Sequence, residues 1–209
     1  TTANDNNGNS HELDKNWNIV GVPYLTSATN PATTIYTNNG YSYDYTVPAE
    51  DCEIKPYQAF MLQTTETLEF TPASTAALNI TKASEGVYAK AYISVDESSP
   101  AKIILSDESS ENFVVNEDAW YTAPTSNAVS ANYFIVDGCQ AGATVQPAAN
   151  DLPMNVYTGA GTSHRISLTA TDGNYNVYLK DAATDETVCL NDEDYTFTAT
   201  AKTTIANRF

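Results

Sequence analysis

The sequence has few basic side chains and no long apolar run. Its 209 residues include 9 Lys and Arg against 26 Asp and Glu, which gives a formal net charge of −17. Nucleic-acid binding requires a surface rich in Lys and Arg, so this charge argues against nucleic-acid partners. It also disfavours anionic membrane surfaces, and without a long apolar run we expect no membrane insertion. An acidic surface suits an extracellular or cell-surface setting, or simply prevents aggregation.

Cysteines are few and isolated. Cys52, Cys139 and Cys189 form no CxxC motif, which excludes the common zinc and redox motifs. An odd number of thiols cannot pair completely within one chain. One disulfide with one leftover thiol is an open alternative, and we favour three buried free thiols.

Sustained helical periodicity is also missing. No window repeats apolar residues with the period of a helix, so we expect no helix longer than a single turn. Thr, Ser, Asn, Tyr and Val dominate instead, and β-branched and aromatic side chains favour strands. Short alternating segments separated by polar turns predict an all-β fold of antiparallel β-sandwiches, of Greek-key or jelly-roll type, with little or no helix.

Changes in composition divide the chain into three predicted segments. Residues 1–15 are polar and rich in Asn, and we expect a flexible leader or linker. Residues 16–83 predict a small β module, and residues 84–209 a C-terminal β-sandwich. The last predicted strand, Ile205–Phe209, is unfinished, so we expect a mature or excised portion of a longer protein.

The predicted strands alternate apolar and polar residues between clusters of Gly, Pro, Asn and Asp. In the small module they are Trp17–Leu25, Thr33–Thr37, Gly40–Val47, Tyr57–Thr64 and Thr67–Thr71, with a tight turn at Asn38-Asn39-Gly40. In the second half they are Val87–Val95, Lys102–Leu105, Asn112–Val115, Tyr133–Val136, Met154–Tyr157, Arg165–Thr169, Tyr175–Leu179, Val188–Leu190 and Tyr195–Ala201. The cluster DGCQAG, residues 137–142, is predicted to be a turn.

Two motifs resemble a recurrent region of secreted and cell-surface Bacteroidota proteins. The first pairs WNIVGVPY with IKPYQAFMLQTTETLEFTP, although Gly21-Val22-Pro23 stands where that family commonly has Gly-Asn-Pro. The second is similar to the family's C-terminal YLxDxxT…L…YxFxA…RF pattern. The matching residues are Ile54, Pro56, Gln58, Ala59, Phe60, Tyr178, Leu179, Asp181, Thr184, Leu190, Tyr195, Phe197, Ala199, Arg208 and Phe209.

The resemblance implies a β-sandwich that often follows leucine-rich or β-helical repeats, in an architecture like that of type IX secretion substrates. It also implies an adhesive or scaffolding role at the cell surface. In that family the closing Arg-Phe begins a longer strand. We therefore expect this chain either to lack residues or to complete its sheet with a partner.

Residues typical of catalysis are sparse. No nucleophile-elbow sequence and no phosphate-binding Gly-rich loop is present. We expect His164 to be an ordinary surface residue rather than part of a Ser–His–Asp site. The acidic residues cluster in turns, where solvated surface charge is the default, so we expect no enzymatic activity.

Aromatic residues offer a candidate ligand-binding surface. Tyr41, Tyr43 and Tyr45 alternate on one face of a predicted strand, where their rings could form a platform for sugars. The full candidate set is Trp17, Tyr36, Tyr41, Tyr43, Tyr45 and Tyr57. The other interpretation, which we favour, is that these tyrosines pack between sheets. Trp120-Tyr121 is a lesser candidate that we expect to be a core anchor.

Acidic residues near the C-terminus offer a candidate calcium site, although no EF-hand spacing is present. The predicted ligands are Asp181, Asp185, Asp192 and Asp194, with Glu186 and Glu193 nearby. The alternative is a set of solvated turns.

Three functions from different classes fit these features. The first is a non-catalytic extracellular module with an adhesive or scaffolding role, whose partner is a cell-surface protein or glycan. The second is a carbohydrate-binding module using the tyrosines. The third is a self-assembling subunit of a filament or surface layer, since an open sheet edge accepts a neighbour's strand.

Overall fold

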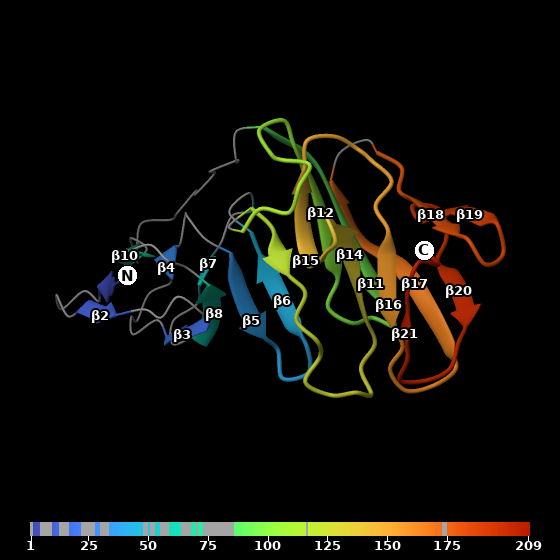
Figure 1. Cartoon of the computed structure of the whole chain (residues 1–209), viewed down its shortest axis with the longest axis horizontal. Coiled ribbons are helices and arrows are strands. Elements are labelled where there is room, and N and C mark those ends of the chain that lie inside the picture. Colours follow the sequence, from blue (N-terminus) through green and yellow to red (C-terminus); the bar gives the residue numbers. More distant parts are fainter. Residues whose placement is uncertain are drawn as a thin grey trace.

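A computed structural model of the protein shows an all-β chain, as predicted (Figure 1). It describes residues 2–4, 10–12, 17–21, 28–29, 34–47, 50, 53–54, 59–63, 68–69, 71–72, 86–115, 117–172 and 175–209. Every regular element in these ranges is a strand. They contain no helix that is long and apolar enough to cross a membrane.

Four strands of the N-terminal part form one antiparallel sheet. Their order across the sheet is β3 (Trp17–Gly21), β8 (Ala59–Gln63), β5 (Ile35–Asn38) and β6 (Tyr43–Thr46). The predicted tight turn joins β5 to β6, and Gly40 has a φ of 99°, which glycine adopts without steric cost. The Asn39 side chain accepts the Tyr41 and Ser42 N–H groups at 3.0 and 2.9 Å, which fixes the turn.

Six short strands form two further small sheets. One contains β2 (Ser10–Glu12), β1 (Thr2–Asn4) and β9 (Leu68–Glu69), and the other β10 (Thr71–Pro72), β4 (Ala28–Thr29) and β7 (Glu53–Ile54). Strands β1 and β2 lie in the stretch 1–15 that we predicted to be a flexible leader or linker. The parallel pairing of β1 with β9 joins that stretch to a strand far along the chain.

Nine strands form the main sheet. They are β20 (Tyr195–Thr198), β17 (Ser163–Asp172), β11 (Val87–Val95), β12 (Ala101–Ser106), β15 (Cys139–Gln146), β14 (Ala131–Val136), β16 (Met154–Tyr157) and β21 (Thr204–Ile205) in order, with β13 (Ala119–Trp120) on β15. A separate hairpin contains β18 (Tyr178–Asp181) and β19 (Glu186–Cys189). The predicted bounds of β11 and β16 are confirmed.

Two predictions in this region are wrong. Residues 137–142 are not only a turn: Asp137 and Gly138 turn the chain with positive φ, and the eight-residue strand β15 follows at once. Residues 112–115 make only an isolated bridge between Val115 and Asp118. The sheet is also not wholly antiparallel, because β12 and β15 run parallel. A parallel pair needs a long crossover connection, and residues 107–138 provide it.

The main sheet curves until its two edges share one core. The Phe209 carbonyl, beside edge strand β21, accepts the Met154 N–H of β16 at 2.9 Å. The Phe209 ring packs 5.0 Å from Phe197 of the opposite edge strand, β20. Both rings pack against the core cluster that also contains Val156 and Ile166. A flat sheet of this width would keep these edges apart.

A second apolar cluster joins the four-stranded sheet to the other face of β12 and β15. In β12, Ile103 packs toward the first core and Ile104 toward the second, the alternation expected of a strand buried on both faces. Tyr36 and Tyr45 pack into the second cluster from β5 and β6. Figure 1 shows this hairpin beside the main sheet.

Candidate functional site

The segment that leaves β13 is held by two buried tyrosine hydroxyls. The Tyr36 hydroxyl accepts the Trp120 N–H at 2.9 Å. The Tyr45 hydroxyl accepts the Thr122 N–H at 2.9 Å and donates to the Thr122 carbonyl at 3.3 Å. The two tyrosine rings meet edge to face with centroids 5.5 Å apart. Tyr121 therefore lies between two fixed backbone positions.

A buried carboxylate fixes the other end of this segment. Asp118 is 1% exposed, and its oxygens accept the N–H groups of Val114 and Val145 at 2.7 and 2.8 Å. Thr34 donates to the Asp118 carbonyl at 3.1 Å. Burial raises the pKa of Asp118, against the effect of these backbone hydrogen bonds. The path of the chain into β13 is thus set by contacts from both sheets.

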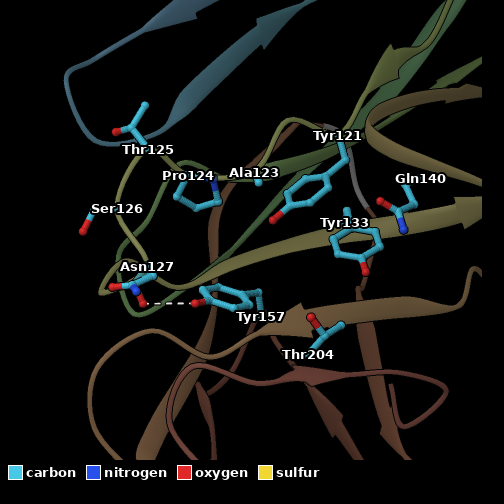
Figure 2. A pocket seen from close by; sticks show the side chains of 10 residues that line it. All are labelled: Tyr121, Ala123, Pro124, Thr125, Ser126, Asn127, Tyr133, Gln140, Tyr157 and Thr204. Atoms are coloured by element: carbon cyan, nitrogen blue, oxygen red, sulfur yellow. Dashed lines mark hydrogen bonds between the residues drawn. The ribbon is translucent and has the colours of Figure 1, made fainter.

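A cavity of about 800 Å³ opens beside this segment (Figure 2). Tyr121 stacks on Tyr133 of β14, with ring centroids 4.2 Å apart and an interplanar angle of 23°. Tyr157 of β16, the strand paired with β14, also lines the cavity, and its hydroxyl donates to the Asn127 carbonyl at 3.1 Å. The lining residues, which we call the tyrosine groove, are Tyr121, Ala123, Pro124, Thr125, Ser126, Asn127, Tyr133, Gln140, Tyr157 and Thr204.

The tyrosine groove carries no charged side chain, although 26 of the 209 residues are acidic. Burial raises the pKa of Tyr121, so its hydroxyl stays neutral. The Tyr121 hydroxyl, the Gln140 carboxamide and the Thr204 hydroxyl make no hydrogen bond to the part of the chain that the structure describes. The groove therefore offers aromatic surface and neutral hydrogen-bonding groups.

The loop that forms one wall of the groove is fixed on two sides. Thr125 donates from its N–H and its hydroxyl to the Tyr41 carbonyl, both at 2.9 Å. At the other end, Ala160 N–H donates to the Ala128 carbonyl at 2.9 Å. Gly159 allows this approach, because a Cβ there would lie 2.3 Å from the Ala128 carbonyl oxygen. The groove is thus formed before any ligand binds.

The candidate tyrosine platform on β6 does not form. Tyr36 and Tyr45 are 2% and 4% exposed and pack between the sheets, the interpretation that we favoured. Burial raises the pKa of both hydroxyls. Tyr43 is half-buried, and only Tyr41 is well exposed, on the turn before β6. Of Trp17 the structure describes only the backbone, in β3, and Tyr57 lies outside the described residues.

The Trp120-Tyr121 pair divides between two roles. Trp120 is half-buried and packs on Phe113 with centroids 4.3 Å apart, outside both core clusters, so it is not the core anchor that we expected. Tyr121 belongs to the groove. Tyr133 and Tyr157 were not predicted as site residues, because alternation within each strand does not reveal which strands are neighbours. The pairing of β14 with β16 brings them to the same wall.

The predicted calcium ligands are not gathered around a common point. Asp181 is buried, and its carboxylate accepts Arg208 at 2.7 to 3.1 Å and the Tyr195 hydroxyl at 2.6 Å. The Arg208 guanidinium holds the pKa of Asp181 well below its usual range. Asp194 pairs instead with Arg165 at 3.3 Å. Among the described residues, no three His, Cys, Asp or Glu side chains form a group that could hold a metal.

His164 is buried, not on the surface as predicted. Its Nδ1 lies 2.7 Å from Asp96 Oδ2, and the Ser130 hydroxyl donates to the same oxygen at 2.6 Å. Burial raises the pKa of Asp96, but the hydrogen bonds from His164 and Ser130 outweigh it and lower the pKa. Because the serine contacts the aspartate and not the imidazole, the three side chains do not form a nucleophilic triad.

The described cysteines are unpaired. Cys139 and Cys189 are half-buried free thiols, and Cys52 lies outside the described residues. The motif resemblance to Bacteroidota surface proteins stays a prediction. Comparison with known proteins finds no matching family model, no matching curated protein and no matching solved structure.

Proposed function

We propose that the protein is a non-catalytic binding module that holds a neutral glycan in the tyrosine groove. The observation that carries this proposal is an uncharged, tyrosine-lined cavity in a strongly acidic chain. Its volume of about 800 Å³ lies within the range of about 300–1,000 Å³ found for small-molecule sites. A charged ligand would find no counter-charge among the lining residues.

The lining chemistry matches what a sugar presents. The C–H faces of a sugar ring are apolar and pack on flat aromatic side chains, while its hydroxyls need both donors and acceptors. The stacked pair Tyr121–Tyr133 supplies the aromatic surface, and Gln140 and Thr204 supply neutral donors and acceptors. Because the wall loop is already fixed by hydrogen bonds, binding orders little additional chain.

An extracellular, adhesive role follows from this proposal. The acidic surface and the motif resemblance both support a module displayed at a cell surface. Neutral glycans are abundant on such surfaces, and a module that only binds them needs no catalytic group. The groove residues include no carboxylate that could act as a general acid or base.

A glycan array tests the proposal. We expect the native chain to bind at least one neutral saccharide and Tyr121→Ala to weaken that binding by about tenfold or more. Tyr178→Ala is the matched control, because Tyr178 is 64% exposed on β18 and does not line the groove. Binding that is equal in native chain and Tyr121→Ala would contradict the proposal, as would a native chain that binds no neutral glycan.

A further inference from the structure

A buried lysine lies between two carboxylates where the N-terminal hairpin meets the main sheet. Lys102 of β12 is 6% exposed, and its Nζ donates to the Tyr45 carbonyl of β6 at 2.5 Å. Nζ also lies 3.4 Å from Asp44 Oδ1 and 3.5 Å from Glu50 Oε1. The amine is therefore directed toward the hairpin, with one carboxylate on each side.

The two carboxylates have different surroundings. Glu50 has an 8% exposed side chain, accepts the Val47 N–H at 3.2 Å on one oxygen, and accepts the Tyr92 hydroxyl on the other. The Tyr92 ring lies 5.0 Å from the lysine Nζ and covers the site. The Asp44 side chain is 50% exposed, and its oxygen accepts the adjacent Tyr45 N–H at 2.9 Å. Glu50 is fixed and enclosed, whereas Asp44 reaches the amine from the solvent side.

We propose that Lys102 and Asp44 form an isopeptide bond within the chain, with Glu50 as the residue that transfers the protons. Glu50 accepts a proton from the lysine ammonium and passes it to the Asp44 carboxylate, and the resulting neutral amine attacks the γ-carbon of Asp44. The new C–N bond forms as a C–O bond breaks, and Glu50 takes the second proton from the amine nitrogen and passes it to the departing hydroxyl, which leaves as water. One ammonium and one carboxylate become one amide and one water molecule, with no oxidant or other reactant.

Position and burial favour this reaction. The lysine Nζ lies 3.4 Å from Asp44 Oδ1, which places the amine beside the carboxyl group that it attacks and removes the cost of bringing the two groups together. The buried Lys102 ammonium carries a desolvation cost, and conversion to a neutral amide removes that charge. The half-exposed side of Asp44 gives the released water a path to solvent.

The bond would tie the two sheets together. Asp44 lies on β6 of the four-stranded sheet and Lys102 on β12 of the main sheet, so the cross-link would carry force directly between them. It would also hold the β5–β6 hairpin, whose tyrosines position the segment beside the tyrosine groove, against β15. The inference does not depend on what the groove binds.

Intact-protein mass spectrometry of the purified full chain tests the proposal. We expect a mass lower than that of the sequence by one water molecule, and a digest in which the peptide containing Asp44 is joined to the peptide containing Lys102. Asp44→Ala is the first variant, because its half-exposed side chain can be removed without opening the core. It should show the full sequence mass.

Two further variants test the roles of Lys102 as nucleophile and Glu50 as proton carrier. Lys102→Arg keeps the positive charge but not the nucleophilic amine. Glu50→Gln keeps the size and an acceptor oxygen but transfers no proton, and both variants should show the full sequence mass. A water loss that persists in Lys102→Arg would reveal a succinimide at an aspartate and overturn the proposal. A native chain that keeps its full mass after prolonged incubation would overturn it too, and a joined Glu50–Lys102 peptide would overturn the assignment of roles.

Discussion

The tyrosines on the two sides of residues 119–122 have opposite surroundings. Tyr36 and Tyr45 are enclosed between the sheets, and their hydroxyls bind the backbone of Trp120 and Thr122. Tyr121 and Tyr157 line the groove, where the Tyr121 hydroxyl has no partner in the described part of the chain. The same side chain thus supports the backbone in one place and presents a free polar group in the other. The difference lies in which strands surround it.

We infer that the enclosed tyrosines stabilise the fold and that the groove tyrosines bind the ligand. Substitutions of the enclosed tyrosines should therefore change the free energy of unfolding, and substitutions of the groove tyrosines should change ligand binding. Each prediction below tests one side of that division.

Tyr45→Ala should have the largest effect on stability. Removing a 4% exposed aromatic ring leaves a cavity and two unpaired groups on Thr122, so we expect a loss of about 3–5 kcal/mol in the free energy of unfolding. Urea denaturation measures it, and Tyr178→Ala on the exposed hairpin should change stability by less than about 0.5 kcal/mol. An equal loss of unfolding free energy in Tyr45→Ala and Tyr178→Ala would contradict the assignment of stability to the enclosed tyrosines.

Alkaline pH should destabilise the protein through the enclosed tyrosines. Burial raises the pKa of Tyr36 and Tyr45 in the folded state, so their contribution is fully present below about pH 10 and is lost as pH rises further. We expect the free energy of unfolding to fall by about 1.4 kcal/mol per pH unit for each of them above that pH. Tyr36→Phe and Tyr45→Phe should each reduce the slope in urea denaturation, and a slope that neither variant changes would contradict this reasoning.

Gly142→Ala should destabilise the contact between β15 and the hairpin. A Cβ at this position would lie 2.5 Å from the Tyr45 ring, which is closed in by the second core cluster. We expect a loss of about 1–3 kcal/mol, typical of an overpacked core. Thermal unfolding measures it. The comparison variant is Ala141→Gly, which removes a buried methyl group at the neighbouring position where Gly142→Ala adds one. Gly138, on the exposed turn before β15, offers no neutral control, because its φ of 76° would strain a serine there.

Tyr157→Phe should have a smaller effect on stability than the core substitutions and a measurable effect on binding. It removes one hydrogen bond to the Asn127 carbonyl, worth about 0.5–1.5 kcal/mol, and takes a hydroxyl from the groove wall. We expect weaker glycan binding at nearly native stability, measured by titration calorimetry with an array hit. Native affinity in this variant would remove Tyr157 from the recognition surface.

Much of the fold follows from local alternation. β11 and β16 have the predicted bounds because each is a clean run of alternating residues between turn signals. β15 was not predicted, because Ala141, Gly142 and Ala143 have low strand propensity. The Tyr45 ring, which comes from a hairpin almost a hundred residues earlier, leaves no room for a side chain at Gly142. Tertiary packing, and not local preference, makes this segment a strand.

The groove was even less accessible from the sequence. Tyr121 was noted beside Trp120, but nothing local distinguishes an enclosed tyrosine from a groove tyrosine. That distinction depends on the pairing of β14 with β16 and on the hairpin that covers the other side of β13. The burial of His164 was missed for the same reason, since Asp96, which follows β11, reaches it only after β11 and β17 pair.

An NMR titration of the isotope-labelled full chain with the best-binding neutral saccharide tests the central claim most directly. We predict that the amide shifts that move most belong to residues 121–127, Tyr133, Gln140 and Tyr157, and that Tyr121→Ala removes the response. Shifts that centre on the β18–β19 hairpin, or on the exposed turn at Tyr41 with the groove amides unmoved, would contradict the claim.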